Sequence, residues 1–415
     1  MDGPLSGIKV VELATFVAGP VTARLLADMG AEVIKVEAPE GDGWRASGVS
    51  YLPRFNSDEN PIFDIYNAGK KHISLNLKTA EGKEVLHKLL AEADVLVTNT
   101  RPAALRRLGF SYEELKERYP RLIFAAVLGY GEKGPEAHKP AFDTTAFWAR
   151  SGFLRDMAVV TDEYFPVTGP SGVGDTATGY LLMGEICAAL YRRTVTGKGD
   201  YVSSGLYHNG VFCMGTMVLL AQDPFGRFYP YNRVDNGVIG GSYQTADGDW
   251  IYFALGNGAK TIAIYLKLMG LSHLAEDPLF APEVRWQNRY EIYELFKKAF
   301  LSKTAAEWVA LADEYDLPLV RMAHFKDVSK DPQAWANGYV EQMTFRNGNV
   351  DVMPTSPIEM ASVTPRPTKP APLNGGDTVE VLRGLGYREE EIQAMIAAGA
   401  AVAVHHDNKG ENNHA

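Results

Sequence analysis

Asp175 is the residue whose type and surroundings best suit nucleophilic chemistry. It lies in the run GVGDTATG (residues 172–179), whose small residues leave room for a bulky electrophile. A long helical pattern starts here, and the N–H groups and positive dipole of a helix start favour an ionised carboxylate. Such a carboxylate, where accessible, can attack an acyl carbon. An aspartate at a helix start is also a common N-cap with a purely structural role, and the pattern alone leaves both interpretations open.

Three arginines, Arg101, Arg106 and Arg107, follow closely on an apolar run that ends at Asn99. Arginine offers forked donors that match phosphate oxygens, so the cluster suits a phosphate clamp at the carboxyl edge of a sheet. Lys70, Lys71 and Lys78 would add to the same positive field. The alternative is a solvated basic face on a short helix.

A third group is aromatic and consists of Phe225, Phe228, Tyr229 and Tyr231. Clusters of this kind pack in a core or an interface, or they line a pocket for an apolar substrate. The sequence leaves both roles open.

The run GYGEKG (residues 129–134) matches the GxGxxG pattern and follows a strand-like segment. A dinucleotide site needs a helix to open at once, so that its N-terminus can hold the pyrophosphate. Pro135 and Pro140 leave room for no more than a turn. We therefore predict a loop beside a ligand rather than a dinucleotide site.

The composition excludes several classes of protein. Of the 415 residues, 46% are hydrophobic and 22% are charged, as in ordinary globular proteins. The net charge of −10 disfavours a nucleic-acid partner, and no apolar run reaches the ~18 residues of a membrane span. Cys187 and Cys213 have no metal-like spacing and suit a reducing compartment. The nine histidines are scattered, so we expect a cytoplasmic enzyme without a metal centre.

The first part of the chain alternates short apolar runs with helical patterns. Strands are expected over residues 8–13, 32–37, 94–99 and 122–129, and helices over 20–30, 82–93 and 102–108. This alternation predicts βαβ units in a doubly wound, Rossmann-like parallel sheet, an α/β fold. Because ligands of such sheets bind outside the carboxyl ends of the strands, the site is expected at the loops 14–20, 99–102 and 129–143.

The rest of the chain is less regular. A long helical pattern from Asp175 to Arg193 ends before Gly197. Past residue 224 the composition shifts to Gly, Tyr, Asn and turn dipeptides, which predicts a second, smaller domain up to about residue 325. The segment 363–374 carries four prolines and is expected to be an extended arm, and the polar residues 405–415 are expected to be disordered.

Several motifs stand in a characteristic order along the chain. They are LSGIKVVELATFVAGP, NAGKKHISLNLKT, ADVLVTNTRP, GYGEKGP, GDTATG and TGKGDYV. Together they resemble the class III CoA-transferases, a family that includes the formyl-CoA and carnitine CoA-transferases, and the similarity runs from about residue 5 to about residue 395. The motifs look most similar to the branch that acts on 2-hydroxy acids in amino-acid fermentation, such as the phenyllactate and 2-hydroxyisocaproate CoA-transferases.

The resemblance implies roles for individual residues. Asp175 would be the catalytic aspartate. The other implied positions bind CoA or flank the acyl pocket: Val17 and Ala18 in the loop after the first strand, Leu75 and Lys78 at the adenine end, Asn99, Thr100 and Arg101 at the family's Asn-Phe-Arg triplet, Arg107 on a phosphate, and Phe142 and Asp143 beside the acyl pocket. Thr100 departs from the family pattern, which has an aromatic residue there.

The family fold implies an intertwined homodimer in which each chain forms a ring threaded by the other. Residues 1–205 and 330–415 would form the large CoA-binding domain, 225–325 a smaller α+β domain, and 206–224 and 326–375 linkers or arms. The implied partners are an acyl-CoA and a small carboxylic acid. CoA would be a substrate, with no tightly bound cofactor, and neither nucleic acid nor a membrane is expected.

The implied reaction moves CoA from an acyl-CoA, here expected to be an enoyl-CoA, to a 2-hydroxy acid with an apolar side chain. It would pass through an aspartyl anhydride and an aspartyl-CoA thioester. Two other functions stay open. The family's racemases have a histidine at the position of Phe142, so that half of their acid–base pair is missing here. A non-catalytic CoA-binding subunit would have no need of Asp175.

Overall fold

A computed structural model of the chain describes residues 3–51, 56–157, 169–223, 240–254, 259–281, 284–364 and 367–404. The aromatic cluster 225–231 and the polar tail 405–415 lie outside the described residues. The chain divides into two compact units. Unit 1 comprises Met1–Ser151, Gly169–Thr216 and Asp331–Ala415, and unit 2 comprises Gly152–Thr168 and Met217–Lys330.

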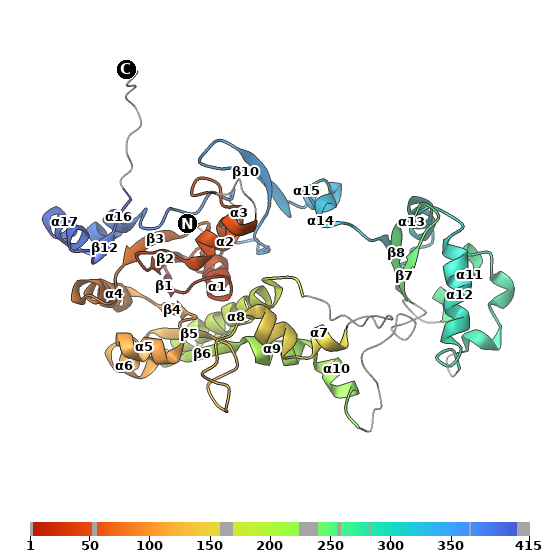
Figure 1. Ribbon diagram of the computed structural model, residues 1–415, viewed down its shortest axis with the longest axis horizontal. Coiled ribbons are helices and arrows are strands. Elements are labelled where there is room, and N and C mark those ends of the chain that lie inside the picture. Colours follow the sequence, from red (N-terminus) through yellow and green to blue (C-terminus); the bar gives the residue numbers. More distant parts are fainter. Residues whose placement is uncertain are drawn as a thin grey trace, which may run out of the picture. The chain divides into compact units, whose positions relative to one another are not determined.

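Unit 1 is built on a seven-stranded sheet with the order β12-β3-β2-β1-β4-β5-β6 (Figure 1). The strands are β1 (Lys9–Leu13), β2 (Glu32–Glu37), β3 (Lys71–Leu75), β4 (Val95–Thr98), β5 (Ile123–Leu128), β6 (Tyr201–Gly205) and β12 (Ala401–Val402). All neighbouring strands are parallel except the short β12, which pairs antiparallel with β3. The order β3-β2-β1-β4-β5-β6 is that of the Rossmann fold, whose direction of winding reverses between β1 and β4. The prediction of a doubly wound parallel sheet is confirmed.

Helices cover both faces of this sheet, because successive strand residues point to opposite sides. Val10 and Val97 pack on one face, under α1 (Ala18–Asp28) and α8 (Val173–Thr196). Val11 and Leu96 pack on the other. The helices on that second face are α4 (Ala80–Glu92), α5 (Pro102–Leu108), α6 (Tyr112–Arg118), α16 (Thr378–Gly384) and α17 (Glu389–Ala397). Burial on both faces explains the continuous apolar runs from which the strands were predicted.

The helix α8 has two different apolar faces. Its inner face packs in the core through the residues predicted from the sequence, which are Leu182, Ile186, Ala189 and Leu190. It ends before Gly197, whose φ of 70° is left-handed, as the sequence predicted. Its outer face leaves five large apolar side chains exposed, namely Val173, Tyr180, Leu181, Tyr191 and Val195. No helix in the described ranges, α8 included, is both long and apolar enough to cross a membrane.

Two segments expected to be linkers contain regular structure. Residues 206–224 hold α9 (Leu206–Cys213) and α10 (Gly215–Leu220). Residues 326–375 hold most of α14 (Phe325–Val328), then α15 (Pro332–Ala336) and the hairpin β10 (Val340–Thr344) with β11 (Val350–Pro354). The hairpin turns at Asn347-Gly348, where Gly348 has a φ of 85°, and an Asn-Gly turn is a strong hairpin signal that the sequence analysis did not use.

The described part of the proline-rich segment 363–374 is fixed to unit 1 of its own chain. The carboxylate of Asp64, in α3 (Pro61–Asn67), accepts a hydrogen bond from the backbone N–H of Ala371 at 2.9 Å. Arg45, in α2 (Gly43–Tyr51), donates to the carbonyl of Pro372 at 2.9 Å. This part of the arm therefore covers α2 and α3.

Unit 2 is a small α+β unit, as predicted. Its antiparallel sheet has the order β7-β8-β9, with β7 (Gly241–Gln244), β8 (Trp250–Phe253) and β9 (Leu319–Arg321). The helices α11 (Ala259–Leu268), α12 (Arg289–Phe300) and α13 (Ala305–Glu314) pack with it around one apolar core. Trp308, Tyr243 and Tyr265 are the largest fully buried side chains of that core.

Candidate active site

The loops that follow β1 and β4 meet at the carboxyl edge of the sheet, where the winding reverses. The side-chain amide of Asn99 accepts from the backbone N–H of Thr15 at 3.0 Å and donates to the carbonyl of Thr15 at 2.6 Å. The hydroxyls of Thr98 and Thr100 both donate to the carbonyl of Leu13, at 2.8 Å and 3.3 Å. The amide of Asn99 thus holds the loop before α1, and this edge is the place where a sheet of this order binds its ligand.

Asp175 lies in the first turn of α8 and is half-buried. The N-cap of this helix is Gly172, with a φ of 83°, so the interpretation of Asp175 as the N-cap is wrong. Gly172 and Gly174 are needed here because a side chain at either position would crowd a neighbouring aromatic residue. A Cβ at Gly174 would stand 2.4 Å from the ring of Phe147, and a Cβ at Gly172 would stand 3.1 Å from the hydroxyl of Tyr66.

A second carboxylate, from another part of the chain, lies beside the start of α8. Asp143 opens a π-helix (Asp143–Ala149) and is only 4% exposed. Neither of its oxygens has a hydrogen-bond partner of good geometry within the described residues. Burial raises the pKa of Asp143, while the backbone N–H groups of Gly172, Asp175 and Gly174 act in the opposite direction. The helix-end N–H groups therefore face Asp143.

This arrangement makes Asp175 an unusually basic carboxylate. Burial, with the nearby charge of Asp143, raises the pKa of Asp175 from 3.8 to about 7. The sequence predicted the opposite, namely that the helix start would keep Asp175 ionised. The prediction failed because the N–H groups act on Asp143, and because desolvation and a like charge both disfavour the ionised form.

Tyr66 is a further residue of this site that the sequence analysis missed. It belongs to α3, is half-buried, and its hydroxyl forms a hydrogen bond with the hydroxyl of Thr176. Burial raises the pKa of Tyr66, and the charge of Asp175 raises it further, so Tyr66 keeps its proton. A tyrosine in an amphipathic helix carries no signal of such a role in a single sequence.

Three more predicted residues surround this point. Val17 is 2% exposed, and its Cγ1 would lie 4.0 Å from a Cβ at Gly172. Ala18 is 3% exposed and begins α1, which packs along α8. Phe142 precedes Asp143, is 56% exposed, and lies edge-on to Phe16 with ring centroids 5.6 Å apart.

The remaining predicted residues lie further along the same edge. Leu75 ends β3, two strands from β1, and its side chain is buried in the core, while Lys78 is exposed. Arg101 and Arg107 are exposed at the two ends of α5, and neither forms an ion pair in the part of the chain that the structure describes. The structure thus gathers Val17, Asp143 and Asp175, and it leaves Arg101, Arg107 and Lys78 open to solvent. The prediction that Lys70 and Lys71 add to this positive field is wrong, because Lys70 is buried against Glu12 and Lys71 pairs with Glu32 and Glu380.

Comparison with known proteins identifies the family of the chain. The model of "CoA-transferase family III" matches residues 5–378. The chain belongs to this family. The CoA-transferase is 40% identical to the (R)-2-hydroxy-4-methylpentanoate CoA-transferase of Clostridioides difficile over 94% of its own chain and 97% of the relative. It is 37% identical to the cinnamoyl-CoA:phenyllactate CoA-transferase of Clostridium sporogenes, over 94% and 95% of the two chains.

Solved structures show the same fold as this CoA-transferase. A CAIB/BAIF family protein from Brucella suis is 28% identical, with a TM-score of 0.77 over 93% of this chain and 100% of the other. The protein Rv3272 from Mycobacterium tuberculosis is 29% identical, with a TM-score of 0.78 over 92% and 99% of the two chains. The resemblance to class III CoA-transferases inferred from the motifs is confirmed.

Proposed function

We propose that this CoA-transferase moves CoA from an enoyl-CoA to a 2-hydroxy carboxylic acid with an apolar side chain, and that Asp175 is its covalent nucleophile. The observation that best supports Asp175 as the nucleophile is its half-buried carboxylate beside Asp143, with a pKa raised to about 7. A carboxylate with a raised pKa is a better nucleophile once ionised. The relatives named for 2-hydroxy-4-methylpentanoate and phenyllactate support the acceptor class, and the relative named for cinnamoyl-CoA supports the donor.

The proposed reaction has two halves. In the first, the ionised Asp175 attacks the thioester carbon of the donor, which releases CoA thiolate and forms an acyl–aspartyl anhydride. The thiolate then attacks the aspartyl carbonyl, which releases the donor acid and leaves an aspartyl-CoA thioester. In the second half, the acceptor carboxylate attacks that thioester, and the released thiolate takes the acceptor acyl group from the new anhydride. Asp175 is regenerated as a carboxylate, and one thioester has replaced another.

The surroundings of Asp175 suit this sequence of steps. Its negative charge is unfavourable next to Asp143 in a desolvated place, and it disappears when the anhydride or thioester forms. The repulsion is therefore relieved on the way to the covalent intermediates, which favours them relative to the free carboxylate. Tyr66 keeps its proton beside Asp175, so its hydroxyl is available as a hydrogen-bond donor where an oxyanion develops.

The rest of the CoA molecule is proposed to lie along the carboxyl edge of the sheet. Arg101 and Arg107 present exposed guanidinium groups on α5, which suits the phosphates. Lys78 and Leu75 stand after β3, where the adenine end is proposed. Thr100 and Asn99, which join the β1 and β4 loops, would lie between these two groups.

We also propose that a second copy of the chain covers α8. The exposed side chains of its outer face recur at helical spacing, and Phe212 in α9 is 82% exposed. Exposed apolar patches of this kind are characteristic of interfaces. The double substitution Tyr191→Glu with Val195→Glu is expected to yield a monomer in sedimentation, and a wild-type monomer at micromolar concentration would contradict the proposal. The intertwined arrangement, the domain limits and the cytoplasmic location stay predictions.

A transfer assay with a panel of acids and thioesters tests the function. The donors are cinnamoyl-CoA and its saturated analogue, and the acceptors are lactate, 2-hydroxy-4-methylpentanoate, 3-phenyllactate and oxalate. We expect CoA transfer to the 2-hydroxy acids with larger side chains and none to oxalate. Transfer to none of these acids would contradict the proposal, as would exchange of the α-hydrogen of the acyl-CoA without transfer, which is the reaction of a racemase.

A further inference from the structure

Phe16, in the loop between β1 and α1, adopts a backbone conformation that is rare for a residue with a side chain. Its φ is 63°, and among the described residues only Asp316 is another non-glycine residue with a positive φ. A bulky residue in this region is strained and persists only where its surroundings hold it there. Because glycine would adopt the conformation without strain, the ring of Phe16 is the feature that needs an explanation.

The ring of Phe16 joins two other aromatic rings from distant parts of the chain. It lies edge-on to Phe142 at 5.6 Å and tilted against Trp44 at 6.1 Å, measured between ring centroids. Gly43 leaves room for it, since a Cβ there would stand 3.2 Å from the ring. We call Phe16, Trp44 and Phe142 the aromatic wall. Phe142 is 56% exposed, so the wall offers apolar surface to a ligand.

Two members of the aromatic wall are sequence neighbours of residues that lie near Asp175. Phe16 precedes Val17, whose Cγ1 would lie 4.0 Å from a Cβ at Gly172, in the turn that begins α8. Phe142 precedes Asp143, which faces the N–H groups at the start of α8 and acts electrostatically on Asp175. The central ring of the wall, Phe16, and one of its two ends, Phe142, are thus each one residue away from a group near the nucleophile.

One buried carboxylate fixes two members of the wall. Asp42 is 2% exposed, and its Oδ1 accepts hydrogen bonds from the backbone N–H of Phe16 at 3.0 Å and of Trp44 at 2.9 Å. Its Oδ2 forms an ion pair with the Nζ of Lys35 at 2.9 Å. The strained backbone of Phe16 is therefore tied to the backbone of Trp44 through a single side chain.

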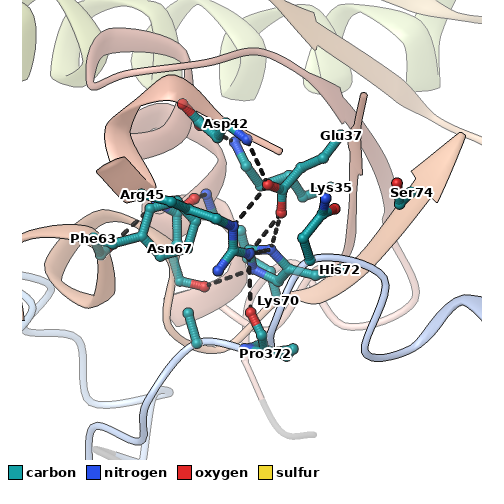
Figure 2. A network of polar contacts seen from close by, with 12 residues as sticks. Lys35, Glu37, Asp42, Arg45, Phe63, Asn67, Lys70, His72, Ser74 and Pro372 are labelled. Carbon is teal, nitrogen blue, oxygen red and sulfur yellow. Dashed lines mark hydrogen bonds and ion pairs between the residues drawn. The ribbon is translucent and has the colours of Figure 1, made fainter. Parts of the chain in front are cut away.

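Lys35 belongs to a buried network that also holds the loop between β1 and α1, which carries Phe16. Its ammonium is fully buried, pairs with Glu12 at 2.7 Å and donates to the carbonyl of Ala14 at 2.8 Å. The backbone N–H of Asp42 donates to Glu37 at 2.8 Å. Figure 2 shows how the network continues from Glu37 to Arg45, which also contacts His72 and Pro372.

Buried ion pairs are weak contributors to stability, but they permit few alternative geometries, because each displaced charge would lose its partners. A network that ends on the backbone of a strained aromatic residue therefore fixes the position of that residue. We propose that the aromatic wall binds the side chain of the acyl group, selecting large apolar groups, and that Asp42 and Lys35 are positioning residues for it. The proposal rests on the proposed function and adds the residues that set its specificity.

Binding to a variant that cannot turn over tests the wall. In the Asp175→Ala background, the dissociation constants of 2-hydroxy-4-methylpentanoyl-CoA and lactoyl-CoA are measured by calorimetry, since these ligands differ only in the side chain. We expect the parent to prefer the larger ligand. Adding Phe16→Gly, which relieves the backbone strain and removes the ring, should reduce that preference by about 10-fold or more.

Two results would contradict the proposal that the aromatic wall binds the acyl side chain. One is a parent without preference for the larger ligand. The other is a Phe16→Gly protein that unfolds no earlier than the parent and keeps the full preference. Phe16→Ala serves as the companion variant, because it also removes the ring but retains the strain, so it should show the same loss of preference with a lower unfolding temperature.

Asp42 is tested through the same preference, which a purely structural role would not change. Asp42→Ala should lose the preference although its side chain does not touch the acyl group, and Asp42→Asn, which keeps an oxygen acceptor, should retain most of it. The matched control is Asp94→Ala. Asp94 also accepts from a backbone N–H, that of Lys9 at 2.8 Å, and pairs with Arg193 at 2.7 Å, but it lies before β4, at the opposite edge of the sheet.

Asp94→Ala should lower the stability and leave the preference intact. Equal loss of preference in the Asp42→Ala and Asp94→Ala proteins would contradict the positioning role. Transfer activity of the wild type is measured in parallel. A protein that binds the two thioesters with the expected preference but transfers no CoA would refute the proposed function and leave the wall supported.

Discussion

Glu12 and Asp175 are both acidic residues withdrawn from solvent in unit 1, but the charges beside them have opposite signs. Glu12 lies between two buried ammonium groups, with Lys35 at 2.7 Å and Lys70 at 2.6 Å. Burial acts to raise the pKa of Glu12, but the two lysines outweigh it and lower the pKa. Among the residues that the structure describes, no cation pairs with Asp175, and burial together with Asp143 raises its pKa to about 7.

This difference in neighbouring charge gives Glu12 a structural role and Asp175 a chemical one. A carboxylate that is neutralised by two cations has no tendency to react, and it holds the loop that carries Phe16. A carboxylate that is buried beside another carboxylate is kept in an unfavourable state, which bond formation relieves. Within unit 1, the fold thus neutralises the charge of Glu12 and places Asp175 beside a second carboxylate.

The largest effect is expected from removing the unsatisfied acid. Asp175→Asn keeps the shape of the side chain but cannot form the anhydride, so the rate of CoA transfer should fall by at least about 10⁴-fold. The measurement is steady-state transfer, with CoA binding as the control for folding. A variant with a tenth or more of the wild-type rate would remove Asp175 from the mechanism.

The next largest effect concerns the satisfied acid. Glu12→Gln leaves Lys35 and Lys70 without their shared charge, and breaking a buried pair typically costs about 3–5 kcal/mol of unfolding free energy. Urea unfolding measures this loss. The matched control is Glu92→Gln, because Glu92 pairs with Lys9 at the same 2.7 Å but with both side chains about half exposed, which should cost less than about 1 kcal/mol. Equal losses in the two variants would show that burial does not distinguish them.

A smaller effect tests the repulsion between the two aspartates. In Asp143→Asn the like charge is gone, so ionised Asp175 is less disfavoured and its pKa should fall. Since only ionised Asp175 attacks, the acid limb of kcat/KM, expected near pH 7 in the wild type, should move to lower pH. An unchanged limb, in a variant that binds CoA normally, would mean that Asp143 does not set the ionisation of Asp175.

The smallest effect is expected from an exposed charge. Arg107→Ala should weaken CoA binding by about 10-fold, as expected for one lost phosphate contact, and should leave the rate at saturating CoA nearly unchanged. Arg118→Ala, an exposed arginine at the end of the neighbouring helix α6, is the control and should bind CoA as the wild type does. Equal affinity in both variants would place the phosphates elsewhere.

The fold could be predicted largely from local patterns. The β-branched runs predicted β1 and β2 to within a residue, and α5 spans residues 102–108 as predicted. These features follow from the burial of both sheet faces and from helix signals, which a single sequence displays. The hairpin of β10 and β11 was missed although its Asn347-Gly348 signal is present.

The chemistry of the site could be predicted only in part. Asp175 stands out because glycines and small residues surround it in the sequence. That Asp143 faces the start of α8, and that Asp42 reaches the backbone of Phe16, depends on contacts between segments far apart in the chain. Tertiary contacts of this kind raise the pKa of Asp175. A helix start by itself favours the ionised carboxylate, so the direction of the pKa shift could not be predicted from the sequence.

Covalent trapping tests the central claim most directly. The enzyme is mixed with the donor thioester in the absence of acceptor acid, quenched with hydroxylamine, and digested for mass spectrometry. An activated carboxyl group of Asp175 should appear as a hydroxamate in the peptide that spans the start of α8, and the label should vanish in Asp175→Asn. A wild-type enzyme that turns over fully, yet carries the hydroxamate on another residue or on none, would contradict the account.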